Sequence, residues 1–351
     1  MNILVIRRDN IGDLVCTTPL LAALRRHYPA AHIAVLVNSY NAPVLAGNPD
    51  INEICIYRKA KHRAPGESLI GIWWETFRLL RRLRAARFDL TIVATPGRQP
   101  AALKFARWVA AARTLAYGRI GDDISDLLPL TGVNGVSTID GLHETAAVMR
   151  LLTPLGITEA PGSLRVFAAA DAVATTTLPA GRGPLIALHI SARKPLQRWP
   201  IERFGELARK LHVLHDARFL LFWSPGDENH PQHPGDDRKA AQLQALCPDL
   251  PLLPWPTEHL GELIAGLSLA DLVICSDGGA MHLAAGLGKP IVCFFGNSDV
   301  ERWRPWGIPC EILQPASRQV ADVSLEETLA AVQRLTAKLD SDTRQLFRSD
   351  T

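Results

Sequence analysis

Short apolar runs alternate with longer segments of helical periodicity along the whole chain. Runs of four to seven apolar residues have the length of buried strands, and the amphipathic segments between them have the length of helices. In the first half, strands are predicted at 3–6, 33–37, 53–57, 90–94 and 114–117, and helices at 14–27, 43–46, 69–86, 101–111 and 139–154. In the second half, strands are predicted at 184–190, 219–223, 250–253, 269–275 and after Pro290, and helices at 201–214, 237–246, 260–267, 280–287 and 325–339. This order is typical of parallel sheets with crossover helices, so we expect an α/β protein of two Rossmann-like, doubly wound domains facing a cleft.

A change of composition separates the two halves. Residues 155–183 are rich in Ala, Thr, Gly and Pro, which is typical of a connection between domains. A length of 351 residues also favours two domains over one. We therefore predict an N-terminal domain over 1–160, a linker over 161–183 and a C-terminal domain over 184–351.

Composition indicates an ordinary globular protein, with 47% apolar and 21% charged residues. No uninterrupted apolar stretch approaches the roughly 18 residues that span a bilayer, and the N-terminus resembles a first strand more than a signal peptide. The six cysteines are scattered and form no C-x-x-C pair, so we expect reduced core thiols, no zinc site and a cytoplasmic location.

Charge is distributed unevenly, although the net charge is only +3. Residues 58–87 contain nine Lys or Arg but only Glu67 and Glu75 as acids. Such a block is either a solvated face or a contact for an anionic partner such as a nucleic acid, acidic lipid headgroups or a phosphorylated glycolipid. Trp73, Trp74 and Phe77 lie within it and suit either a membrane–water interface or the core side of a helix.

The segment 276–282, SDGGAMH, joins a buried strand to a helix through two glycines. The bare turn lets a ligand approach the backbone, and the first N–H groups of the helix have no internal partner, so this turn suits an anion. Asp277 lies at the carboxyl end of the strand, where open α/β sheets bind ligands, and His282 lies in the first helical turn. The alternative is that Asp277 only caps the helix.

A second aspartate, Asp13, follows the first strand in the segment RRDNIGDLVCTTPLL, residues 7–21. Gly12 allows a sharp turn there, and a carboxylate at this end of a strand is well placed to accept a proton from a bound hydroxyl. A helix cap is again the alternative. Neither the G-x-G-x-x-G spacing of dinucleotide sites nor a P-loop is present here.

Cations gather in HISARKPLQRWP, residues 189–200, between a predicted strand and helix. Arg193, Lys194 and Arg198 can neutralise a diphosphate without a metal ion, or they can simply improve solubility. Trp199 and Pro200 are expected to fix the geometry of the loop. Further along, Trp303 and Trp306 either stack on a sugar or base or belong to the core.

Taken together, these segments resemble glycosyltransferase family 9, the ADP-heptose:lipopolysaccharide heptosyltransferases. The resemblance runs from IRRDNIGDLV through TTPLLAALRRHYPAAHIAVLV and the RWP loop to SDGGAMHLAAGLGKPIVCFFG, and so covers nearly the whole chain. It implies the GT-B fold, with the acceptor on the N-terminal domain and the nucleotide sugar on the C-terminal one. It also implies inverting transfer that needs no metal ion or other cofactor.

The resemblance also implies roles for individual residues. Asp13 would be the general base, with Arg8, Asn10, Arg78, Arg81 and Arg82 on the acceptor. The nucleotide sugar would be held by Ser191, Arg193, Lys194, Arg198, Asp277, Gly278, Gly279 and His282. One position departs from the expected pattern, because Gln197 stands where the family has a lysine two residues before the Trp-Pro pair.

The implied partners are a nucleotide sugar, ADP-heptose, and an anionic lipid-linked glycan, with no nucleic acid. The implied location is cytoplasmic, with peripheral contact at the inner membrane. Three alternatives stay open: transfer of a different sugar to a core, O-antigen or capsule glycan; a nucleotide-sugar epimerase or hydrolase of the same fold; and a non-catalytic nucleotide-binding scaffold.

Overall fold

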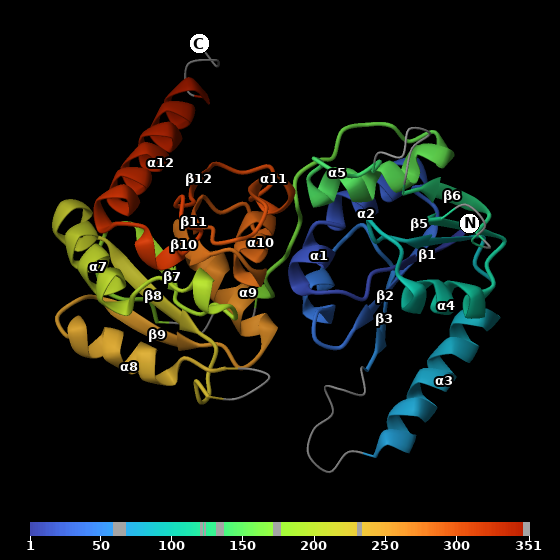
Figure 1. Ribbon diagram of the computed structural model, residues 1–351, viewed down its shortest axis with the longest axis horizontal. Coiled ribbons are helices and arrows are strands. Elements are labelled where there is room, and N and C mark those ends of the chain that lie inside the picture. Colours follow the sequence, from blue (N-terminus) through green and yellow to red (C-terminus); the bar gives the residue numbers. More distant parts are fainter. Residues whose placement is uncertain are drawn as a thin grey trace. The chain divides into compact units, whose positions relative to one another are not determined.

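The computed structural model describes residues 1–58, 68–119, 122, 124–130, 137–170, 177–229 and 234–346. The chain divides into two compact units, Met1–Arg165 and Val166–Thr351 (Figure 1). The point of division falls inside the predicted linker, of which residues 171–176 lie outside the described part. Each unit is built on its own six-stranded parallel sheet.

The first unit has the strand order β3-β2-β1-β4-β5-β6, with every neighbouring pair parallel. Its strands are β1 (Asn2–Ile6), β2 (His32–Asn38), β3 (Glu53–Tyr57), β4 (Leu90–Val93), β5 (Arg113–Gly118) and β6 (Asp126–Pro129). The first five confirm the predicted strands, and β6 was not predicted. The chain order reverses between β1 and β4, so this pair forms the switch point at which doubly wound sheets bind ligands.

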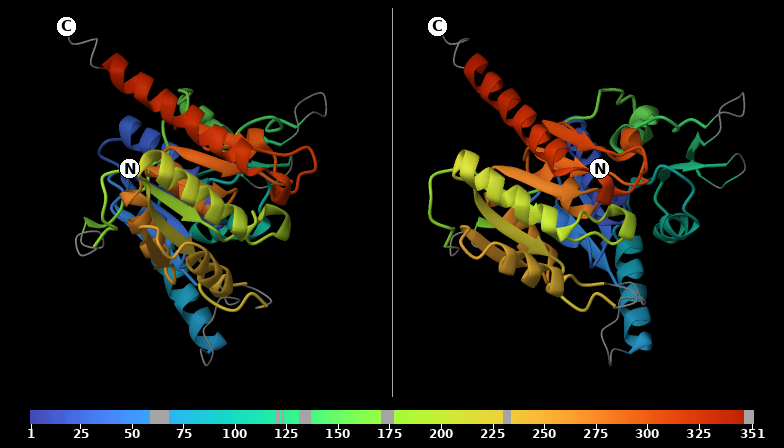
Figure 2. Two further views of the ribbon diagram at one scale, coloured as in Figure 1. Left: turned by 90° about the vertical axis from the view of Figure 1, so that its left-hand side faces the viewer. Right: turned by 60° about the vertical axis from the view of Figure 1, so that its left-hand side comes forward.

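The helices of the first unit differ from the prediction at two places. The predicted helix 14–27 is two helices, α1 (Ile11–Val15) and α2 (Thr18–His27). The predicted helix 139–154 begins only at α5 (Glu144–Met149), after Gly141 with its positive φ, and then tightens into the 3₁₀ turn η3 (Arg150–Leu155). The remaining elements are η1 (Ala42–Leu45), α3 (Leu69–Ala85) and α4 (Pro100–Val109), and α3 extends away from the sheet of its unit (Figures 1 and 2).

The second unit repeats the same topology, with the order β12-β11-β10-β7-β8-β9. Its strands are β7 (Leu185–His189), β8 (Arg218–Trp223), β9 (Leu252–Pro256), β10 (Leu272–Ser276), β11 (Ile291–Phe294) and β12 (Cys310–Leu313). Its helices are α7 (Ile201–His215), α8 (Asp237–Leu246), α9 (Leu260–Leu269), α10 (Gly279–Gly286), α11 (Val300–Trp303) and α12 (Leu325–Leu346), with the 3₁₀ turns η4 (Pro195–Gln197) and η5 (Val320–Asp322). The switch point here lies between β7 and β10.

Core packing in the second unit reaches into the loop that precedes α7. The Trp199 side chain is buried, its ring stacks on Phe294 with centroids 4.7 Å apart, and its Nε1 donates to the carbonyl of Val323 at 2.9 Å. The expectation that Trp199 fixes the geometry of this loop is confirmed. Trp199 thereby anchors the C-terminal end of the basic loop to the sheet.

The cysteines form no disulfides among the residues that the structure describes. All six cysteines are free thiols, and all except Cys310 are buried. Across the described ranges, no helix combines the length and apolarity needed to cross a membrane.

Candidate active site

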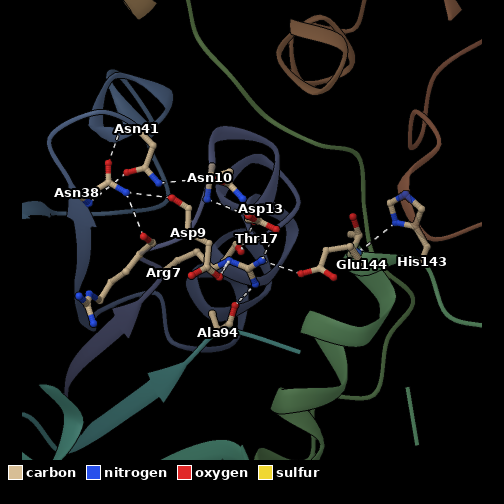
Figure 3. Close-up of polar contacts among 12 residues, drawn as sticks. Arg7, Asp9, Asn10, Asp13, Thr17, Asn38, Asn41, Ala94, His143 and Glu144 are labelled. Atoms are coloured by element: carbon tan, nitrogen blue, oxygen red, sulfur yellow. Dashed lines mark hydrogen bonds and ion pairs between the residues drawn. The ribbon is translucent and has the colours of Figure 1, made fainter. Parts of the chain in front are cut away.

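A buried arginine occupies the switch point of the first unit (Figure 3). Arg7 follows β1 directly, and only 1% of it is exposed. Its Nη1 donates to the carbonyl of Ala94, the residue that follows β4. The guanidinium therefore bridges the carboxyl ends of the two strands that define the switch point.

Three carboxylates surround this one guanidinium. Nη2 lies 3.0 Å from Oδ1 of Asp13 and 2.6 Å from Oε1 of Glu144, and Nε lies 3.4 Å from Oδ2 of Asp9. Burial opposes the charge on Arg7, but the fields of Asp13, Glu144 and Asp9 outweigh it and raise the pKa of the guanidinium. Arg7 is therefore a permanent cation that cannot by itself neutralise the three acids around it.

Asp13 is held from two sides. It lies in the first turn of α1 and is 8% exposed. While Oδ1 faces Arg7, Oδ2 accepts from the backbone N–H of Asn10 at 2.8 Å and from its Nδ2 at 2.9 Å. Asn10 is the N-cap residue of α1, and the Asp13 carboxylate completes a capping box by accepting the backbone N–H of Asn10. Asp13 thus supports the helix start and also presents a fixed carboxylate at the switch point.

The loop that carries Arg8 and Asn10 is fixed by the neighbouring strand β2. Asn38 Nδ2 donates to the carbonyls of Arg8 and Asp9 at 3.1 and 3.0 Å (Figure 3). The Arg8 guanidinium lies between two rings, with its Cζ 4.5 Å from the centroid of Tyr57 and 4.2 Å from that of Phe105. The structure therefore brings Arg8 and Asn10 to the same edge of the sheet as Asp13.

The three arginines predicted on the acceptor lie on α3. Arg78 and Arg81 stack on aromatic side chains of their own helix, with Cζ 5.6 Å from the Trp74 ring and 6.0 Å from the Phe77 ring. Arg82 forms an ion pair at 3.1 Å with Glu53 on β3. Among the basic residues of this block that precede α3, Arg58 lies 3.9 Å from Glu75, whereas Lys59, Lys61 and Arg63 lie outside the described residues, as does Glu67.

A neutral amide holds Asp277 at the switch point of the second unit. Gln197, which is 6% exposed, donates from Nε2 to Oδ2 of Asp277 at 2.9 Å and to Oγ of Ser298 at 3.2 Å. The Ser276 hydroxyl in turn donates to the Gln197 carbonyl at 2.6 Å. Burial raises the pKa of Asp277, and hydrogen bonds from Ser298 and Gln197 together with the charge of Lys194 oppose that rise.

Helix α10 begins immediately after this aspartate. Gly278 is the cap residue, and the Asp277 carboxylate bonds to Gln197, which argues against a simple helix cap. The amides of the first turn, beginning at Gly279, are available to an anion at this edge of the sheet. The His282 side chain is 3% exposed, and its ring packs edge-on against Trp303 with centroids 6.0 Å apart.

The basic loop 191–198 lies beside the same edge. The Ser191 hydroxyl accepts from the backbone N–H of Ser224 at 2.9 Å, and Arg198 Nε donates to the carbonyl of Ala192 at 2.9 Å. Arg193 and Lys194 are exposed, and the charge of Lys194 reaches Asp277. Lys194 is therefore an exposed cation whose charge acts on the Asp277 carboxylate.

His189, at the end of β7, begins the same segment. Burial lowers its pKa to about 4, so its ring is neutral at physiological pH. His189 therefore contributes a neutral imidazole to this switch point.

Sequence reasoning missed the partners that hold the two aspartates. Glu144 and Arg7 are 137 positions apart, and Gln197 and Asp277 are 80 apart, so no local pattern joins them. Arg7 alone carried a signal, because a charged residue directly after an apolar strand lies at the ligand-binding edge of a parallel sheet. In the part of the chain that the structure describes, no three His, Cys, Asp or Glu side chains are grouped to hold a metal ion.

Comparison with known proteins shows which family the sequence matches. The model of glycosyltransferase family 9 (heptosyltransferase) matches residues 143–331. Lipopolysaccharide heptosyltransferase 3 of Escherichia coli is 26% identical over 316 residues, which are 84% of this chain and 83% of that protein.

Two solved structures have a similar fold. One is a family 9 glycosyltransferase from Veillonella parvula, with a TM-score of 0.79, 20% identity, and coverage of 96% of this chain and 97% of that one. The other is the E. coli heptosyltransferase WaaC with ADP-2-deoxy-2-fluoro heptose, with a TM-score of 0.70, 18% identity, and coverage of 95% and 99%. The predicted GT-B fold class is confirmed.

Proposed function

Because the chain belongs to glycosyltransferase family 9, we propose that it transfers a heptose from ADP-heptose to a lipopolysaccharide core acceptor with inversion and without a metal ion. The observation that carries this proposal is Asp13, which Arg7 and Asn10 hold at the switch point of the first unit. The similar E. coli protein is named for heptosyl transfer to lipopolysaccharide, and the similar E. coli structure contains an ADP-heptose analogue.

Each unit is proposed to carry one part of the reaction: proton transfer in the first unit and stabilisation of the leaving diphosphate in the second. Asp13 accepts the proton of the acceptor hydroxyl while that oxygen forms a bond to the anomeric carbon of the donor. The bond from the anomeric carbon to the diphosphate oxygen breaks, and the electron pair leaves with ADP. The amides at the start of α10 and the cations Arg193 and Lys194 face the developing negative charge on the diphosphate.

The donor contacts follow from the chemistry of the second site. Asp277 is an acceptor of hydrogen bonds and suits sugar or ribose hydroxyls, whereas a diphosphate suits Gly278, Gly279 and the α10 amides. Ser191 and Arg198 shape the loop beside them through their bonds to Ser224 and Ala192. His282, which lies in α10, is proposed to hold this helix in place by packing its ring against Trp303.

A second candidate is the transfer of a different sugar by the same mechanism. It is favoured by Gln197, a neutral residue whose amide is already engaged by Asp277 and Ser298. A lysine at this position would place a charge beside the donor, and this chain has no such charge there. A panel of nucleotide sugars, with the shift in unfolding temperature as the readout, separates the two candidates, because ADP-heptose gives the largest stabilisation only under the first.

The acceptor side of the proposal uses the first unit. Arg8 and Asn10 lie at the edge that carries Asp13, and Arg78, Arg81 and Arg82 on α3 suit the anionic groups of a lipid-linked glycan. We also propose peripheral contact with the inner membrane from the cytoplasmic side, because α3 exposes four large apolar side chains beside these arginines. They are Ile70, Trp73, Trp74 and Phe77.

One incubation tests the proposed function as a whole. The protein is mixed with ADP-heptose and lipopolysaccharide truncated before its first heptose, and both products are followed by mass spectrometry. We expect the glycolipid to gain one heptosyl residue as ADP is released. Conversion of the donor without a change in the glycolipid would identify an epimerase or hydrolase, and binding without conversion would identify a scaffold.

A further inference from the structure

Glu144 is a buried acid to which neither the sequence nor the proposed reaction gives a role. It is 1% exposed and lies at the first residue of α5, far along the chain from Asp13. Its Oε1 accepts from Arg7 Nη2 at 2.6 Å, and the same nitrogen lies 3.0 Å from Oδ1 of Asp13 (Figure 3). One guanidinium nitrogen therefore connects Glu144 to the proposed base.

Two hydrogen bonds hold the helix that carries Glu144, one at its N-cap and one in its middle. His143 caps α5 by accepting the N–H of Thr145 on its Nδ1 at 3.1 Å. The Tyr117 hydroxyl, at the end of β5, donates to the carbonyl of Ala147 at 2.8 Å. Because the Tyr117 bond ties α5 to the sheet and the His143 bond orders its first turn, the Glu144 carboxylate is held in place as an acceptor for Arg7.

Arg7 is in turn fixed in a single orientation. The Ala94 carbonyl takes its Nη1, Asp9 faces its Nε, and Glu144 takes its Nη2. Hydrogen bonds from Nη1 to Ala94 and from Nη2 to Glu144 fix the plane of the guanidinium, and Nη2 is thereby directed at Asp13. Without Glu144, the end of the guanidinium nearest Asp13 would lose its second anchor.

A purely structural role for Glu144 does not explain why three carboxylates surround the single guanidinium of Arg7. A buried cation needs one well-placed acid, and each further buried carboxylate costs free energy that its attraction to the cation does not fully return. Here Asp9, Asp13 and Glu144 share Arg7, and the excess is negative. Three carboxylates therefore share one guanidinium, and Glu144 takes part in setting how closely Arg7 is held against Asp13.

We propose that Glu144 is a positioning residue that acts through Arg7 on Asp13. This inference rests on the proposed function, in which Asp13 is the base. Glu144 contacts no substrate in this account, and it fixes the direction and the share of positive charge that Asp13 receives.

The test is a comparison of two Glu144 variants. Glu144→Gln keeps the volume and an oxygen that can accept from Arg7, whereas Glu144→Ala removes both. We expect kcat for heptosyl transfer to fall about tenfold in Glu144→Gln and about a hundredfold in Glu144→Ala, with KM for the donor unchanged within twofold. Asp50→Asn is the matched control, because Asp50 is a similarly buried acid of the same unit that pairs with Arg165 at 2.7 Å, and it should keep kcat within twofold.

A double-mutant cycle separates positioning from general support of the fold. In an Asp13→Asn background, where residual transfer is measured in single turnovers, Glu144→Gln should cause no further loss. An equal loss in both backgrounds, or full kcat in both Glu144 variants, would overturn the inference. Full turnover by Asp13→Asn itself would instead overturn the assignment of Asp13 as the base, on which the inference rests. Failure of the unaltered protein to transfer a heptose would overturn the proposed function, so these failures are distinguishable.

Discussion

One aspartate lies at the switch point of each unit, Asp13 after the first strand and Asp277 after the fourth, and the two have different partners. Asp13 faces the cation Arg7, whereas Asp277 faces the neutral amide of Gln197. Burial beside a neutral partner disfavours the charged form of a carboxylate. Accordingly, burial raises the pKa of Asp277 despite the charge of Lys194.

This difference predicts a stability effect at Asp277. Since the folded pKa is raised, the folded state binds the proton more tightly than the unfolded chain, and the stabilisation present below pH about 4 is lost as the pH rises. Asp277→Asn removes the cost of ionisation, so its unfolding temperature at pH 7.5 should exceed that of the unaltered protein by a few degrees. The difference should vanish near pH 4. Differential scanning calorimetry across this range checks the sign.

The same substitution should weaken donor binding about tenfold, the worth of one hydrogen bond to a charged group. Isothermal titration with the nucleotide sugar measures this loss. A variant that is more stable and binds the donor equally well would remove Asp277 from the donor site.

At this scale the sequence could predict the two aspartates but not their partners. Asp13 and Asp277 are recognisable because each stands next to a glycine in the segment that joins an apolar strand to a helix. Arg7, Glu144 and Gln197 acquire their roles through contacts between distant segments, and hydrophobic periodicity contains no information about such contacts.

Among the elements, every central strand was predicted, as was the edge strand β3, whereas two other edge strands were not. β6 and β12 lie at the edges of their sheets and bury their side chains only partly, so their residues lack the apolar pattern of a central strand. β9, at the other edge of the second sheet, was predicted two residues too early because it contains Pro254 and Pro256. Proline is tolerated at an edge, where the backbone N–H need not bond.

Helix α3 is unusual because it exposes its aromatic residues. Trp73 is 72% exposed and Trp74 53%, although an amphipathic helix normally buries such side chains. Spacing along the helix alone does not distinguish a core-facing stripe from a membrane-facing one, which is why the sequence left both open. The exposure and the stacked arginines favour contact with an anionic lipid surface.

Replacing these two tryptophans tests that contact. Trp73→Gln/Trp74→Gln should lower binding to vesicles of phosphatidylethanolamine and phosphatidylglycerol at least tenfold, because each indole that leaves the interface forfeits apolar burial. Trp108→Gln on α4 is the control, since Trp108 is 49% exposed and should leave vesicle binding unchanged. Equal losses in the double variant and the control, measured by co-sedimentation, would contradict a specific role for α3.

For the whole molecule, the two units share one strand order and place one candidate site each at the switch point. The alternation of strand and helix patterns was sufficient to predict this duplication. The division of work that we propose, with the base in the first unit and the nucleotide sugar in the second, depends instead on the chemistry at each switch point. A fixed carboxylate lies at one, and a helix N-terminus beside exposed cations lies at the other.

The most direct test of this division is the Asp13→Ala variant, assayed for heptosyl transfer and for donor binding in parallel. We expect transfer to fall by a factor of about 10³ or more, because the general base is gone. We also expect ADP-heptose to raise the unfolding temperature as it does for the unaltered protein. Near-normal transfer by Asp13→Ala would contradict the assignment of the base, and loss of the donor shift would contradict the separation of the two sites.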